Sequence, residues 1–181
     1  NMQKFDVRIK TYLMFKPPFM SEADALNHSV KWIEAVAEKS DEISVNPMNI
    51  QRGTIIDRLH RNNEYRPPWL WSLVEMIKRA HPSIHPEGGF NGDADQISRL
   101  IVHPTAGGKV RGAHNCGECD SHVVAGIERY AVSGDLREFD GLECQCQAIW
   151  ATEIALEETL PTPLGISKSR RGSVLANLRS L

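Results

Sequence analysis

Four cysteines are the residues of this 181-residue chain whose type and spacing predict a specific chemistry. They form two close pairs, Cys116 with Cys119 and Cys144 with Cys146. Paired thiolates at this spacing are typical of a closed tetrahedral zinc site. An auxiliary iron–sulfur cluster is the first alternative, and reduced thiols without a metal are the second. We expect all four sulfurs to converge, with zinc as the metal.

Histidines near the first cysteine pair offer further ligands. His114 and His122 lie close enough in the sequence to replace a thiolate, or they occupy supporting or surface positions. A different zinc chemistry is suggested by His85-Pro86-Glu87, which with the first cysteine pair superficially copies the signature of zinc nucleobase deaminases. Pro86 is poorly suited to a helix that presents both side chains. The deaminase pattern would also leave the second cysteine pair without a role.

A second group of polar residues follows two segments with the pattern of strands. Residues 7–15 alternate and are rich in β-branched and aromatic side chains, and residues 42–45 form a short β-branched run. Parallel α/β enzymes bind ligands at the carboxyl ends of their strands. Capping and turn formation are the alternative roles here, above all for a serine before a helix. The candidate ligand-binding residues are Lys16, Ser21, Asn46, Asn49 and Arg52.

Strands and helices alternate along most of the sequence, which predicts an α/β protein with a parallel sheet. About two complete β-α units are present, far fewer than a closed barrel contains. We divide the chain into β-α units over residues 1–104 and a four-cysteine module over residues 105–181. The predicted strands cover residues 7–16, 42–45 and 97–103, and the predicted helices cover residues 22–39, 54–61, 69–80, 121–132 and 147–160.

The composition is that of an ordinary soluble globular protein, with 41% hydrophobic and 24% charged residues. No apolar run approaches the roughly 18 residues that a membrane span needs, so no membrane association is expected. The first residues lack the apolar stretch of a secretory signal, which favours the cytoplasm. A formal net charge of −2 gives no overall case for nucleic-acid binding, so RNA contacts would depend on local basic clusters.

Four longer sequence words carry a resemblance to a known family. In order they are KTYLMFKPPFMSEADA (10–25), EISVNPMNIQRGTIIDRL (42–59), EYRPPWLWSLVEM (64–76) and GAHNCGECD (112–120). Together they resemble the C-terminal half of the radical S-adenosylmethionine (SAM) proteins of the archaeosine tRNA-modification pathway, the beta-subunit family of archaeosine synthase. The resemblance spans roughly residues 10–150. Four separated words in one order are far more specific than a short motif.

The resemblance implies a fold and a division of cofactors. It places the chain at the late strands of a partial radical SAM β/α barrel, followed by the four-cysteine module. Radical SAM chemistry needs a Cys-x3-Cys-x2-Cys loop that holds a 4Fe-4S cluster and SAM, and the 181 residues contain no such loop. We therefore expect the cluster and SAM only in the full-length parent, and an inactive isolated fragment. The turns after the strands would border the adenosyl group or the modified base.

The resemblance also implies a reaction and partners. The parent would cleave the lysine carbon–nitrogen bond of a lysine-bearing 7-deazaguanine in the tRNA D-loop, together with a lysine-transferase (alpha) subunit. The alternative function is a noncatalytic, zinc-stabilised module that docks RNA or protein. That alternative predicts a basic or apolar exposed face around the cysteines, whereas the enzyme predicts ligand-binding strand ends at Lys16 and Asn46.

Overall fold

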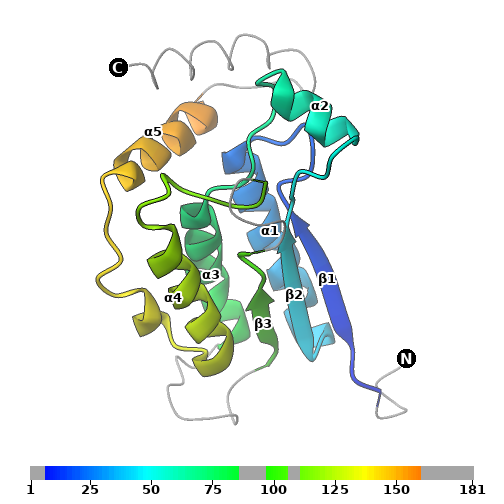
Figure 1. Ribbon diagram of the computed structural model, residues 1–181. Coiled ribbons are helices and arrows are strands. Elements are labelled where there is room, and N and C mark those ends of the chain that lie inside the picture. Colours follow the sequence, from blue (N-terminus) through cyan, green and yellow to red (C-terminus); the bar gives the residue numbers. More distant parts are fainter. Residues whose placement is uncertain (1–6, 86–96, 106–110, 160–181) are drawn as a thin grey trace.

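The computed structural model describes residues 7–85, 97–105 and 111–159 (Figure 1). Its centre is a small parallel sheet with the strand order β1-β2-β3. The strands are β1 (Lys10–Phe15), β2 (Glu42–Pro47) and β3 (Arg99–Val102). The predicted α/β class and parallel sheet are confirmed. Because the strands run in the same direction, their carboxyl ends share one edge of the sheet.

The first helix begins where the sequence places a cap. Helix α1 (Glu22–Val36) starts after Ser21, whose hydroxyl accepts a hydrogen bond from the Asp24 N–H at 3.0 Å. Glu22 and Asp24 put negative charge in the first turn, which favours the helix dipole. The short 3-10 helix η2 (Ala37–Lys39) extends the element to the predicted end. The structure thus gives Ser21 the capping role.

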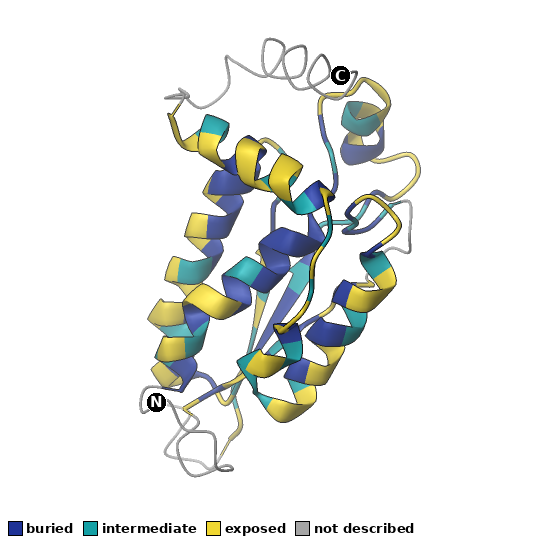
Figure 2. Ribbon diagram, turned by 90° about the vertical axis from the view of Figure 1, so that its left-hand side faces the viewer, coloured by how far each residue is buried: buried dark blue, intermediate teal, exposed yellow. Residues whose placement is uncertain are grey.

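Three helices cover one face of the sheet: α1, α3 (Leu70–Ile84) and α4 (Asp120–Ser133) (Figure 1). The buried side of each turns toward the sheet in Figure 2. Helix α3 continues to Ile84, past the predicted end at Ala80, and contains Pro82. Proline inside a helix removes one N–H donor and its ring crowds the carbonyl of the preceding turn, yet the helix continues to the fully buried Ile84.

One hydrophobic core joins the early and late parts of the chain. Its members include Phe15 and Val102 from the sheet, Ile127 from α4, and Cys119 and Cys146 from the cysteine pairs. Helix α5 (Cys146–Thr159) packs on α1, and the short helix η3 (Leu136–Phe139), which the sequence pattern did not predict, packs on α4. The described residues before and after residue 105 share this core. The division of the chain between residues 104 and 105 stays a prediction.

Helix α2 (Ile55–Arg61) lies outside that core. It rests on a separate cluster formed by Ile50, Ile56 and Tyr65. Figure 1 shows α2 beyond the carboxyl ends of the strands, at one end of the molecule. Helix α2 thus lies beside the edge of the sheet at which parallel α/β proteins bind ligands.

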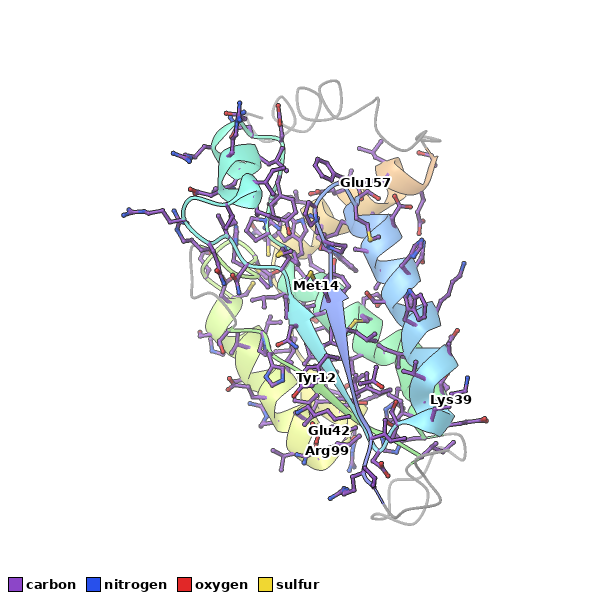
Figure 3. The ribbon with its side chains drawn as sticks, turned by 90° about the vertical axis from the view of Figure 1, so that its right-hand side faces the viewer. Tyr12, Met14, Lys39, Glu42, Arg99 and Glu157 are labelled. Atoms are coloured by element: carbon purple, nitrogen blue, oxygen red, sulfur yellow. The ribbon has the colours of Figure 1, made fainter. Side chains whose placement is uncertain are left out.

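The second face of the sheet is open, because none of the described helices lies over it (Figure 3). Tyr12 and Met14 point outward from β1 and are 67% and 57% exposed. The strand register pairs Tyr12 with Ser44 and Met14 with Asn46, so these residues lie on one face, where Tyr12 and Met14 are exposed and Ser44 is buried. All-parallel sheets are ordinarily covered on both faces. Among the described residues, no helix is long and apolar enough to cross a membrane.

Candidate metal centre

The four cysteine sulfurs come together as predicted, and all lie within 4.8 Å of one another. The Sγ atoms of Cys116 and Cys144 are 3.6 Å apart, as are those of Cys119 and Cys146, and those of Cys116 and Cys119 are 3.9 Å apart. A zinc–sulfur bond of about 2.3 Å gives a tetrahedron edge of about 3.8 Å. The four sulfurs could therefore hold one metal ion in tetrahedral coordination.

The turn that carries the first pair is held by Asp120 and directs backbone N–H groups at Cys116. The Asp120 Oδ1 atom accepts hydrogen bonds from the N–H groups of Asn115 and Gly117, each at 3.0 Å. Gly117 has φ +96°, a conformation that favours glycine. The backbone N–H of Cys119, then that of Glu118, lowers the pKa of Cys116 to about 7. The turn thus favours the charged sulfur that a metal binds.

Two of the cysteines are fixed at the starts of helices. Cys119 is the N-cap residue of α4, and Cys146 is the first residue of α5. Both are buried, whereas Cys144 is half-buried and Cys116 is exposed. Burial raises the pKa of the Cys119 and Cys146 thiols above the ordinary value. A bound cation would stabilise both as thiolates, so metal binding and burial at this site are coupled.

Two neighbouring side chains donate hydrogen bonds to the buried sulfurs. The Trp71 indole N–H donates to Cys146 Sγ at 3.2 Å, and the Asn115 side-chain amide donates to Cys119 Sγ at 3.3 Å. The Asn115 Oδ1 atom also accepts the Trp71 backbone N–H at 3.2 Å. These bonds tie the start of α3 to both cysteine pairs. No local sequence pattern indicates that an indole is aimed at a cysteine 75 residues away.

None of the histidines considered from the sequence joins the sulfur cluster. The ring Nδ1 of His114 bonds the Gly112 carbonyl oxygen at 2.9 Å, and His122 is exposed on α4. His85 follows the end of α3, one helix length of about 20 Å from the Trp71 end. The deaminase arrangement is therefore not formed. Its other two residues, Pro86 and Glu87, lie outside the described residues.

The candidate ligand-binding turns lie at one edge of the sheet. β1 and β2 are parallel neighbours, and the Met48 N–H donates to the Phe15 carbonyl oxygen at 2.9 Å just after both strands. Asn46 is half-buried near the end of β2, Asn49 is half-buried in the following loop, and Arg52 is exposed. The expected shared rim is present. A cofactor-binding role for these residues remains a proposal.

Lys16 lies at the same edge of the sheet and makes contacts within the fold. It is 5% exposed, has φ +55°, and its ammonium group forms a buried ion pair with the fully buried Glu22. Glu22 also accepts the Trp69 backbone N–H through Oε1 at 2.8 Å. The Tyr65 hydroxyl donates to the Lys16 carbonyl oxygen at 2.9 Å. Lys16 thus holds α1, α3 and the turn after β1 together.

Helix α5 connects the metal centre with this rim. It begins at Cys146, and its Glu153 accepts the Trp69 indole N–H at 3.0 Å. One turn further, Glu157 accepts the Ala23 backbone N–H at 2.9 Å. Burial raises the pKa of Glu157 to about 7. The same helix therefore carries a cysteine at one end and rim-facing carboxylates at the other.

The fold and site define an α/β protein that combines a parallel sheet with a four-cysteine site suited to a metal ion. No protein-family model and no solved structure matches the chain. Over 90% of its length it is 33% identical to archaeosine synthase subunit beta of Methanosarcina acetivorans, and over 81% of its length it is 33% identical to that of Thermococcus kodakarensis. An uncharacterised protein of Methanocaldococcus jannaschii is 31% identical over 90% of the chain.

These matches confirm the resemblance to archaeosine synthase beta subunits that the four sequence words carry. The chain is homologous to part of archaeosine synthase subunit beta. It spans 44%, 42% and 42% of the lengths of the three relatives, which is less than half of each.

Proposed function

We propose that the chain is the part of an archaeosine synthase beta subunit that forms late strands of a partial β/α barrel and a zinc-bound module, and that its parent acts on tRNA in the cytoplasm. The observation that carries this proposal is the similarity to archaeosine synthase beta subunits over 90% of the chain. Cys116 and Cys119 lie within the word GAHNCGECD, and Cys144 and Cys146 lie within the span of the resemblance, which supports a shared metal module.

The open sheet face supports the barrel. Tyr12 and Met14 lie exposed on an edge strand of an all-parallel sheet, and such sheets are normally covered on both faces. The relatives are more than twice as long as the matched part, so they contain further chain that could add strands beside β1. In a barrel the open face would turn inward, and Asn46 would face the interior beside the strand ends.

The sulfur geometry favours zinc over an auxiliary cluster. Separations of 3.6 to 3.9 Å suit thiolates on a single ion, whereas a cluster of several irons spreads its cysteines over different metals. In this proposal the zinc is structural, because four protein ligands leave no open position for substrate. The metal fixes α4 and α5 on the body of the molecule and so supports the rim.

The proposed reaction is cleavage of the lysine carbon–nitrogen bond of a lysine-bearing 7-deazaguanine in the tRNA D-loop, with a lysine-transferase alpha subunit as partner. In the parent, SAM and a 4Fe-4S cluster would supply the radical chemistry. The rim residues Asn46 and Asn49 would bind and orient the adenosyl group or the base, and Arg52 would contact the substrate from the same loop. Ser21 and Lys16 would support that rim through the cap and the Glu22 ion pair.

The docking-module alternative has weaker support from the surface near the cysteines. The exposed residues beside the ligands include Glu118 and Glu143, which are acidic and unfavourable for a phosphate backbone. Ile149 is 55% exposed, a single apolar side chain rather than a broad patch. A protein contact at this face would therefore be small.

Assays of the full-length parent test the proposed function. With tRNA carrying the lysine-bearing base, SAM and a reductant, we expect archaeosine to form, and Asn46→Ala to lower turnover at least tenfold with unchanged zinc content. Asn27→Ala on α1 is the matched control and should keep wild-type turnover. The isolated chain should form no 5'-deoxyadenosine. No archaeosine from the wild-type parent, or equal turnover of the two variants, would contradict the proposal.

A further inference from the structure

A local concentration of positive charge surrounds helix α2. We define the α2 segment as residues 51–63, which contain Arg52, Arg58 and Arg61 but only one acid, Asp57. The segment thus has a formal charge of +2 in a chain whose formal charge is −2. Such a local excess attracts polyanions even when the whole chain is acidic.

The single acid of the segment is turned inward. Asp57 is 2% exposed and accepts the Gly53 N–H at 2.9 Å. It also pairs with Arg61 at 3.1 Å and with Arg111 at 3.4 Å. The charge of Asp57 is therefore balanced by Arg61 and Arg111. Arg52 and Arg58 are exposed and pair with no acidic side chain among the described residues.

The segment is held firmly against the sheet edge. Thr54 caps α2 by accepting the Asp57 N–H, and Arg111 donates to the Ile50 carbonyl oxygen at 3.1 Å while its own carbonyl accepts the Ile50 N–H at 2.7 Å. Ile56 packs against Tyr65, whose hydroxyl reaches Lys16. The arginines are thus presented on a fixed support beside the rim. Figure 3 shows nitrogen-tipped side chains extending from this segment away from the body.

A phosphate backbone is the partner that fits this surface. Guanidinium groups bind phosphate oxygens through paired N–H donors, and each phosphate neutralised contributes to affinity by counterion release. We propose that the α2 segment binds the tRNA phosphate backbone next to the modified nucleotide, with Arg52 and Arg58 as the principal contacts, and so directs the base toward the rim after β1 and β2. This inference rests on the proposed function and names the surface through which it reaches tRNA.

Charge reversal tests the surface directly. The 181-residue chain and its Arg52→Glu/Arg58→Glu variant are titrated into a fluorescently labelled, unmodified archaeal tRNA transcript, and Kd is followed by anisotropy between 50 and 200 mM salt. We expect Kd to rise at least tenfold at 50 mM salt. The slope of log K against log salt should fall by about two, roughly one for each phosphate that the variant no longer neutralises.

A matched variant separates this surface from overall charge. Lys31→Glu/Lys39→Glu makes the same change of charge at exposed positions of α1 and η2, and Figure 3 shows Lys39 at the end of the molecule opposite α2. This control should bind tRNA with a Kd within about twofold of wild type. Arg52→Gln/Arg58→Gln, which only removes the charges, should give an intermediate loss and guards against misfolding of the glutamate variant.

Three results would overturn the inference: no tRNA binding by the wild-type chain, equal losses in the two glutamate variants, or wild-type binding by the Arg52→Glu/Arg58→Glu variant. The outcome is independent of product formation. A parent that makes no archaeosine but binds tRNA through this segment would contradict the proposed function and leave the surface assignment standing.

Discussion

The indole nitrogen of Trp71 donates a hydrogen bond to the Sγ atom of Cys146 across 3.2 Å, which joins the start of α3 to the start of α5. Burial raises the pKa of the Cys146 thiol, and this N–H opposes the effect by stabilising the thiolate. Donors to a metal-bound sulfur commonly orient the ligand and tune its basicity. Trp71 is therefore expected to matter to the metal as well as to the core.

Trp71→Phe should weaken metal binding by about 10- to 100-fold, because it removes the N–H donor and keeps an aromatic ring in the core. Competition with a chromophoric zinc chelator measures the affinity. Trp32→Phe is the control, since Trp32 is 57% exposed on α1 and should leave zinc affinity unchanged. Equal zinc affinities for Trp71→Phe and wild type would show that the hydrogen bond has no influence on the site.

Cys144→Ser should release the metal and lower the melting temperature, because three thiolates leave one position of the tetrahedron without a sulfur. A loss of at least about 2 kcal/mol corresponds to roughly 4–8 °C for a chain of this size. Metal analysis and calorimetry measure both effects. Chelator should lower the melting temperature of the wild type and have little further effect on the variant. Full metal content with unchanged melting in Cys144→Ser would rule out a structural role.

Lys16→Met should destabilise the fold by about 3–5 kcal/mol, because it leaves the fully buried Glu22 carboxylate without its cation. Adding Glu22→Gln should restore part of the loss, since the amide is neutral and its oxygen can still accept the Trp69 N–H. Chemical denaturation of both variants measures this coupling. A fully stable Lys16→Met would show that the ion pair with Glu22 contributes little to the stability of the fold.

The carboxyl group of Glu157 predicts a specific dependence of stability on pH. Burial raises its pKa to about 7 in the folded chain, from 4.5 for an ordinary glutamate. Between these values the folded state binds more protons than the unfolded state, so this contribution to stability is full below about pH 4.5 and is lost as the pH rises through about 7. Glu157→Gln removes the titration and should keep the hydrogen bond from Ala23.

The unfolding free energy of wild type relative to Glu157→Gln should therefore fall by on the order of 2 kcal/mol between pH 5 and pH 8. Comparing the two proteins at each pH cancels the shared effect of protonating the cysteines. Denaturant titrations at several pH values supply the data, and Glu158→Gln, at an exposed neighbouring position, is the control. A constant difference between wild type and Glu157→Gln across this range would show that Glu157 has an ordinary pKa.

Local sequence signals determined the secondary structure and the cysteine site. Proline pairs, the Ser21 cap and hydrophobic periodicity act within a few residues, which is why α1, β2, α4 and α5 lie within one to three residues of their predicted bounds. The cysteine spacing likewise restricts the ligands to two tight turns. The exceptions are also local: Pro82 suggested an early end to α3, and η3 is too short to leave a periodic signal.

Contacts between residues far apart in the sequence were decided only by the tertiary structure. Glu22, which pairs with Lys16, also accepts the backbone N–H of Trp69 from 47 residues further along the chain, and the close packing of α1 and α3 leaves that carboxylate no solvent. Trp71 reaches Cys146, and Glu157 reaches Ala23 across 134 residues. Periodicity encodes which face of a helix is buried but not which partner it meets, since that depends on how all elements fill one core.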